Sequence, residues 1–427
     1  MRKHLFKFVV LLISFSSIYY LYTSHGIGAQ IKKNKPVIIT GNNVKSKLDQ
    51  LIGGIKHYLT ELTGNPKIKS GNIIIHSEKI IIRGKDSEIA ECIGKVVIID
   101  KMNNSVLRCK KAIYYKQKNI VEVRGNLNII YNREDDNSKI HLKANKIIYN
   151  MYNKIANAYG NVTVKDNEIK IFAKRANFNR MTKKIIFRGK PFIRKDDDTY
   201  RAEEIICFMD KKDIILNKKV HVTTISEEKD EKTGEIRKVR ADTNCDRIEH
   251  FDNEEKLSRL TGNAVIKREG AIFHGKMFEI RGKDSENVIG ENVNINYETD
   301  NTDGYGDYFR YYKNKGYAML WGNSMMMIKN KKSTEEKVRI YGDLMEFYQD
   351  IDELYINGNV KIFHSSSIIY GDMARYIRKN NQMIITGNPS AKKDDSLIMA
   401  DTIVFNTENN DTKLLGNIRG SADNRGI

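Results

Sequence analysis

The chain has 427 residues, of which 40% are hydrophobic and 30% charged, and its formal net charge is +19. A surplus this basic favours anionic partners such as phosphorylated glycolipids, acidic phospholipids or nucleic acid. No recognisable nucleic-acid-binding module accompanies the charge, so we expect an anionic lipid and no nucleic acid.

Residues 1–29 predict an export segment. Residues 1–4 form a basic head, residues 8–22 are apolar, and residues 26–29 are the small residues that a signal peptidase reads. The alternative is an uncleaved N-terminal membrane anchor. The apolar run is shorter than the roughly 18 to 20 residues of a spanning helix, but residues 5–7 extend it. Both interpretations predict an exported protein.

After this segment a glycine, usually followed by Asn or Lys, recurs at intervals of about thirty residues, and such a fixed period is typical of repeat architectures. The copies are Gly64-Asn65, Gly94-Lys95, Gly125-Asn126, Gly160-Asn161, Gly189-Lys190, Gly262-Asn263, Gly290-Glu291, Gly322-Asn323, Gly358-Asn359, Gly387-Asn388 and Gly416-Asn417, with Lys218 in the same slot of one further copy. Each unit is too short to bury its own apolar face, so neighbouring units must stack.

Apolar and polar residues alternate around each glycine, which predicts half-buried β-strands. The inward positions are Ala90, Cys92, Val96, Ile98, Val121, Val123, Leu127, Ile129, Ala156, Ala158, Val162, Val164, Leu354, Ile356, Val360 and Ile362. Glycine falls on the same side as these residues. Because a glycine within a strand usually marks a bend, we expect the glycines to form a crease along the inside of a folded sheet.

A second strand precedes each glycine strand, as at residues 144–149 and 400–405. Residues 48–62 fit helical spacing as well as the repeat, and we assign them to the repeat. The repeat continues without a Pro/Gly/Ser-rich break, so we expect one continuous domain over residues 30–427. A polar insertion around residues 225–240 interrupts it as a surface loop.

Units with an Ala, an aromatic residue about five positions on and then apolar-x-Gly-Asn-Val-x-apolar, placed behind an export signal, resemble the OstA-like family. That family includes the lipopolysaccharide transport proteins LptA and LptC and the N-terminal domain of LptD. The resemblance implies an all-β fold, a repeat-built open β-jellyroll or β-taco solenoid of antiparallel strands.

The same resemblance implies a non-enzymatic periplasmic bridge that carries lipopolysaccharide or a related glycolipid toward the outer membrane. The inward residues would line its lipid groove, and its ends, near residues 72–82 and 403–418, would dock other β-jellyroll transport proteins or a second copy. An uncleaved leader would add contact with the inner membrane. The alternatives are a phospholipid-transfer bridge, a cell-surface β-solenoid acting as adhesin or scaffold, and a polysaccharide-acting β-helix enzyme, for which no ladder of paired carboxylates is seen.

Signals for catalysis, metals or cofactors are weak, and we predict no enzyme, no cofactor and no metal site. Cys92, Cys109, Cys207 and Cys245 form no C-x-x-C pair. Cys92 lies on the apolar face of its strand and is interpreted as a small buried apolar residue, with a disulfide after export as the alternative. Residues 196–198 are three aspartates that we interpret as a solvated turn. The aromatic and Met-rich stretch 305–327 is either a cargo or partner contact or one densely packed repeat unit.

Overall fold

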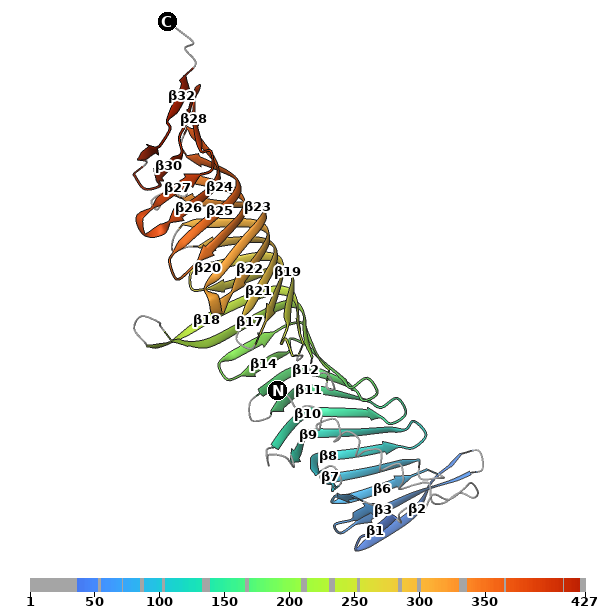
Figure 1. Cartoon of the computed structure of the whole chain (residues 1–427). Helices are drawn as coiled ribbons and strands as arrows, with labels where there is room; N and C mark the ends of the chain where they lie inside the picture. The colour runs from blue at the N-terminus through green and yellow to red at the C-terminus, as the bar shows by residue number, and fades with distance from the viewer. Residues whose placement is uncertain are drawn as a thin grey trace. The chain divides into compact units, whose positions relative to one another are not determined.

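The computed structural model describes residues 37–422, apart from short gaps (Figure 1). These gaps are residues 53–54, 71, 85–87, 102–103, 133–138, 166–168, 209–212, 230–234, 252–253, 283–285, 298–300, 330–335, 365 and 410. The expected export segment, residues 1–29, lies outside the described residues, as does the centre of the expected insertion at 225–240. None of the described residues forms a helix with the length and hydrophobicity needed to cross a membrane.

The chain divides into two compact units, Met1–Lys218 and Lys219–Ile427. The division falls within one strand, β17 (Ile214–Lys229). It coincides with the repeat in which Lys218 replaces glycine. Each unit is described separately below.

Unit 1 is built from strands and turns in its described part. The strands are β1 (Val37–Thr40), β2 (Asn43–Ile52), β3 (Ile55–Thr63), β4 (Lys67–Ser70), β5 (Ile73–His76), β6 (Lys79–Arg83), β7 (Ile89–Asp100), β8 (Ser105–Tyr115), β9 (Ile120–Asn132), β10 (Lys139–Asn150), β11 (Ile155–Lys165), β12 (Ile169–Asn179), β13 (Lys184–Arg188), β14 (Phe192–Lys195), β15 (Asp198–Arg201), β16 (Glu204–Phe208) and the start of β17. The described part of residues 48–62 thus lies in strands β2 and β3, as the repeat assignment predicted.

Unit 2 has the same construction, with two short 3₁₀ turns, η2 (Lys313–Lys315) and η3 (Arg378–Asn380). Its strands after β17 are β18 (Ile236–His250), β19 (Ser258–Arg268), β20 (Ala271–Arg281), β21 (Asn287–Tyr297), β22 (Thr302–Tyr312), β23 (Tyr317–Lys329), β24 (Glu336–Tyr348), β25 (Glu353–His364), β26 (Ser367–Ile377), β27 (Gln382–Thr386), β28 (Ser390–Lys393), β29 (Ser396–Met399), β30 (Thr402–Asn406), β31 (Thr412–Leu415) and β32 (Arg419–Ala422).

Neighbouring strands pair antiparallel in chain order, from β7 to β12 in unit 1 and from β18 to β26 in unit 2. Figure 1 shows these strands side by side as successive rungs. The all-β antiparallel fold predicted from the repeat is confirmed. Where proline follows the corner, at Pro66, Pro191 and Pro389, the long strand is split in two, because proline has no N–H to donate to the ladder.

Each glycine repeat forms a corner at which the strand changes direction. On β7, Gly94 and Lys95 lie opposite the single residue Lys110 of β8, so the pairing contains a β-bulge. Both residues are left-handed, with φ of 74° and 41°. Glycine has no Cβ to obstruct this conformation, which explains why the repeat places it there. The sheet in each unit is therefore folded into two halves.

The glycines lie on the outer side of the corner. The prediction that they form a crease along the inside of the sheet is therefore wrong. A Cβ built on Gly160 would meet the side chain of Asn145 on the preceding strand, and Asn145 is exposed. Gly290 also differs from the prediction. It is buried beside Phe278 without a left-handed φ, and the left-handed residue of that corner is Asn292, with φ of 50°.

The positions of the sheet edges also differ from the prediction. Residues 72–82 lie between β3 and β4 on one side and β7 on the other, because residues 43–63 add further strands. Near the C-terminus, β30 is paired on both sides, with β27 and β31. Among the described strands, β1 and β2 of unit 1 and β31 and β32 of unit 2 each pair with one neighbouring strand.

Candidate functional site

The inner face of the folded sheet in unit 1 consists of continuous apolar rows. Direct cross-strand pairing in the first half aligns Cys92, Ala112, Val123, Ile147, Ala158, Ala176 and Phe187. Pairing in the second half aligns Ile98, Leu107, Ile129, Leu142, Val164, Ile171 and Ile193. All of these residues except Ala176, which is half-buried, are buried. Each row crosses every strand from β7 to β13 or β14 without a charged residue.

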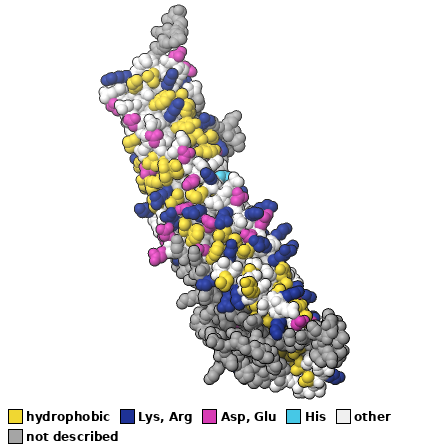
Figure 2. Space-filling view, turned by 90° about the vertical axis from the view of Figure 1, so that its right-hand side faces the viewer, with side chains coloured by type: hydrophobic (Ala, Val, Ile, Leu, Met, Phe, Trp, Pro, Cys, Tyr) yellow, Lys and Arg dark blue, Asp and Glu magenta, His cyan; other side chains and the backbone are white. Residues whose placement is uncertain are grey.

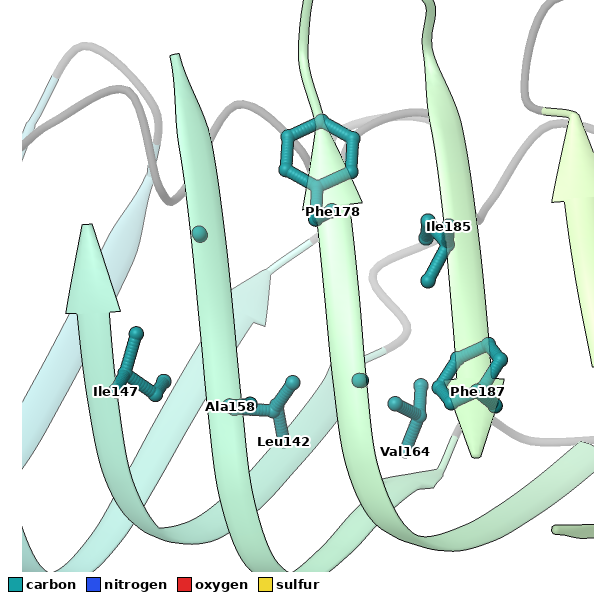
Figure 3. A pocket seen from close by; sticks show the side chains of 9 residues that line it. Leu142, Ile147, Ala158, Val164, Phe178, Ile185 and Phe187 are labelled. Carbon is teal, nitrogen blue, oxygen red and sulfur yellow. The ribbon is translucent and has the colours of Figure 1, made fainter. Parts of the chain in front are cut away.

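The two halves face each other across a small apolar cavity (Figure 3). Leu142 and Ile147 lie on one strand, β10, on either side of its corner, and both line the cavity. Its other lining residues are Ala156, Ala158, Val164, Ala176, Phe178, Ile185 and Phe187. The cavity volume is about 20 Å³, which is room for about one water-sized molecule. Side chains therefore fill most of the interior at this point, and the small cavity lies where the lining residues include three alanines.

Every residue predicted to face inward is buried, with a relative exposure of 9% or less. This holds for Ala90, Cys92, Val96, Ile98, Val121, Val123, Leu127, Ile129, Ala156, Ala158, Val162 and Val164 in unit 1, and for Leu354, Ile356, Val360 and Ile362 in unit 2. The prediction omitted the strands between the glycine strands. Their buried residues, such as Tyr114, Ile147 and Phe178, follow the same alternation, so the signal was present.

Unit 2 contains an equivalent interior. One hydrophobic cluster joins Val338 and Ile340, which precede the corner of β24, with Met345, which follows it. Ile356 and Ile362, on either side of the β25 corner, belong to the same cluster and have no exposed surface. The two halves therefore pack against each other in this unit as well.

Charged residues lie on the outer face. Glu279 accepts hydrogen bonds from Arg259 and Arg281, at 2.7 Å and 2.8 Å, and these arginines lower the pKa of its carboxyl. Burial acts to raise the pKa of Glu122, but hydrogen bonds from Arg124 and Lys146 outweigh it and lower the pKa. Figure 2 shows hydrophobic side chains lying among such charged groups on the face in view.

The four cysteines are free and buried. Burial raises the pKa of the Cys92, Cys109, Cys207 and Cys245 thiols to about 12. Thiols with such a pKa are almost fully protonated at neutral pH and are poor nucleophiles. They are buried side chains of the interior, as the sequence predicted for Cys92.

The other predicted features are placed as follows. Residues 196–197 are a turn that leads into β15, whose first residue, Asp198, accepts a hydrogen bond from Tyr200. The aromatic stretch 305–327 divides between the two faces: Phe309 is buried inside, whereas Tyr308 stacks on Trp321 outside at 5.5 Å between ring centroids. Within the described residues, no group of three or more His, Cys, Asp or Glu side chains is placed to hold a metal ion.

Comparison with known proteins points to one family. Residues 69–230 match the family model described as OstA-like protein. A similar solved structure is LptH, described as the LptA homologous periplasmic component of the lipopolysaccharide transport device from Pseudomonas aeruginosa. It is 12% identical, with a TM-score of 0.25, over 29% of this chain and 94% of LptH. No curated protein matches the chain. Residues 69–230 are thus similar to the OstA-like family.

Proposed function

We propose that the protein is a non-enzymatic periplasmic lipid-transfer bridge, which carries lipopolysaccharide or a related glycolipid through a trough between the two halves of the folded sheet toward the outer membrane. The observation that carries this proposal is the pair of unbroken apolar rows that face each other, those of Cys92 and Ile98. The OstA-like match over residues 69–230 supports it. The lipid-facing residues are the inward residues predicted from the sequence.

The physical reason is the cost of exposing acyl chains to water. Burial of each methylene contributes about 0.8 kcal/mol, so a lipid that crosses an aqueous compartment needs continuous apolar cover. Rows that repeat at every strand present near-equivalent positions, between which a chain can slide at little cost. The net charge of +19 suits an anionic head group that remains outside the trough.

Lipid loading requires the two halves to separate. The cavity beside Phe178 and Phe187 holds about one water-sized molecule, so an acyl chain must displace these rings from the alanines that they cover. Apolar side chains that exchange one apolar neighbour for another lose little free energy, because neither state exposes them to water. The proposal therefore includes an opening of the trough when cargo enters.

Close packing of the interior favours a second candidate, a cell-surface or periplasmic scaffold whose halves never open. Val123 and Ile356 have no exposed surface, as in an ordinary core. A phospholipid bridge would use the same trough with a different cargo. Docking of other β-jellyroll transport proteins or of a second copy at the sheet edges, and an inner-membrane anchor at an uncleaved leader, belong to the bridge proposal.

Mass spectrometry of protein purified without detergent separates these candidates. The bridge predicts a bound glycolipid, at a stoichiometry that falls when Ala158 is replaced by Glu, because an unpaired charge would then face hydrocarbon. The matched control is Tyr159→Glu, since Tyr159 is the next residue on the same strand and is 37% exposed on the outer face. Bound phospholipid would support the phospholipid bridge. A protein that is purified without lipid and takes up none from vesicles would support the scaffold.

A further inference from the structure

Four tyrosines form a strip on the outer face of unit 2, one on each of four successive strands. We call Tyr312, Tyr317, Tyr348 and Tyr355 the tyrosine strip. Tyr312 pairs directly with Tyr317, and Tyr317 with Tyr348. The ring centroids are 6.0 Å apart from Tyr312 to Tyr317, 4.9 Å from Tyr317 to Tyr348 and 5.5 Å from Tyr348 to Tyr355. The rings therefore follow one another without a gap.

The strip faces away from the trough. Phe309 and Met345 are buried inside, and Tyr312 and Tyr348 lie an odd number of positions from them, on the opposite side of their strands. Tyr348 is 37% exposed. The strip ends beside the turns that follow β22 and β24, so it lies at the margin of the sheet.

Polar partners hold the rings in place. The Tyr317 hydroxyl donates to Glu346 at 2.5 Å, and the Tyr355 hydroxyl donates to Glu353 at 2.8 Å. Arg375 donates to Glu353 as well, at 2.7 Å from its Nε. Glu346 also accepts a hydrogen bond from Asn357 at 2.9 Å, and Glu353 is buried, so these bonds fix the ring orientations.

Cationic side chains lie beside the rings at both ends of the strip. The Arg310 guanidinium lies 4.8 Å from the centroid of the Tyr312 ring, and the Lys315 ammonium lies 5.4 Å from the same centroid. Arg375 lies 5.7 Å from the centroid of Tyr355. The surface thus interleaves aromatic rings with donors and acceptors of both charges.

The fold does not require these tyrosines. At the equivalent pairing positions of unit 1, Tyr115 is followed by Ile120 and Asn150. Unit 1 forms the same antiparallel rungs without a run of rings. Four outward aromatic residues in contact thus exceed what sheet formation needs. Tyr348 is exposed and the other three rings are half-buried, and an aromatic patch that reaches the surface marks a binding site.

We infer that the tyrosine strip binds carbohydrate. Pyranose rings have an apolar face of C–H groups that packs on aromatic rings, and their hydroxyls both donate to carboxylates and accept from guanidinium groups.

The chain contains a single tryptophan, which supplies a local reporter. Trp321 lies on β23, on the same outer face as Tyr317. Its fluorescence is titrated with three lipid-free probes: chitotetraose, maltotetraose and the core oligosaccharide of lipopolysaccharide. Saturation-transfer NMR on the sugar protons gives a second readout that does not depend on Trp321. We expect saturable binding of at least one probe by the full chain.

Matched variants test the residues. Tyr317→Ala and Tyr348→Ala should each weaken binding about tenfold or more, which corresponds to about 1.4 kcal/mol. Tyr317→Phe keeps the ring and should retain most of the affinity for sugar. This variant is measured in place of the alanine variants if those fail to fold. Tyr152→Ala removes a tyrosine that is 88% exposed in unit 1 and should change nothing.

The inference is overturned if none of the probes binds at millimolar concentration, or if the alanine variants bind sugar as well as the parent while remaining folded. Binding of anionic vesicles without oligosaccharide binding would assign the strip to a membrane surface and would also overturn it. The inference does not depend on the trough. Failure of lipid loading would leave oligosaccharide binding intact, and loss of the strip should leave lipid loading intact.

Discussion

Gly125 and Lys110 occupy the same corner on neighbouring strands, and a Cβ atom on Gly125 would stand 2.7 Å from the Cβ of Lys110. Gly125 has a φ of 86°, in the left-handed region. Both the backbone conformation and the close approach of the neighbouring strand exclude a side chain at this position.

Replacement of Gly125 by Ala should therefore destabilise unit 1. The left-handed conformation costs an L-residue roughly 1–2 kcal/mol, and the contact with Lys110 adds to it. Urea unfolding measures the loss. The control is Gly304→Ala, because a Cβ there meets its nearest atoms at 3.5 and 3.9 Å and its φ is not left-handed. Equal stability of the two variants would show that the corner imposes no such constraint.

Lys218 stands at the repeat position that glycine occupies in the other units, and its φ is 65°. Here we consider replacing the residue by glycine. Lys218→Gly relieves the left-handed strain and should raise the free energy of unfolding by about 1 kcal/mol, less the entropy that glycine adds to the unfolded chain. In a unit of this size the melting temperature should rise by about 2–4 °C. A lower melting temperature than that of the parent would contradict the strain argument.

The buried thiols make stability depend on pH in the alkaline range. Their pKa rises from 9.0 to about 12 on folding, so the unfolded chain ionises first as pH increases. The stabilising contribution is complete below pH 9 and is lost between pH 9 and 12. Urea midpoints at pH 8 and pH 10.5 should differ less for Cys207→Ala than for the parent. An unchanged difference would mean that Cys207 does not contribute.

The sheet edge at the C-terminal end carries exposed apolar side chains. Leu415 is 52% exposed on β31 and Ile418 is 59% exposed beside it. Unpaired edge strands add neighbouring strands through backbone hydrogen bonds. A photocrosslinker at Leu415 should capture a second copy or another trough-shaped protein, and Ile418→Lys should reduce the yield. The same crosslinker at Tyr152, in a turn of unit 1, is the control, and equal capture at both positions would argue against an edge contact.

Strand identity and inward residues could be predicted from the sequence because both depend on local alternation. Val123 and Ile356 are inward because their neighbours in the chain are polar, and a period of two allows one arrangement only. The assignment of residues 48–62 to the repeat, against an equally good helical spacing, rested on the repeat period.

Features that depend on neighbouring strands could not be predicted in this way. The face of the sheet on which a corner glycine lies depends on its neighbour on another strand, which is Lys110 for Gly125 and Asn145 for Gly160. In the repeat that contains Gly290, the left-handed residue of the corner is Asn292 and not the glycine. The tyrosine strip arises from the pairing of Tyr312 with Tyr317 and Tyr348, whereas the sequence presents these residues as one aromatic stretch and one isolated residue.

Site-specific photocrosslinking along β11 tests the proposed trough most directly. A crosslinker is placed in turn at residues 156, 157, 158 and 159, and the protein is loaded with lipopolysaccharide. The proposal predicts acyl-chain adducts at the inward Ala156 and Ala158 and none at the outward Asn157 and Tyr159. Adducts of equal yield at all four positions, or none at the inward positions when lipid is bound, would contradict a lipid path between the two halves of the sheet.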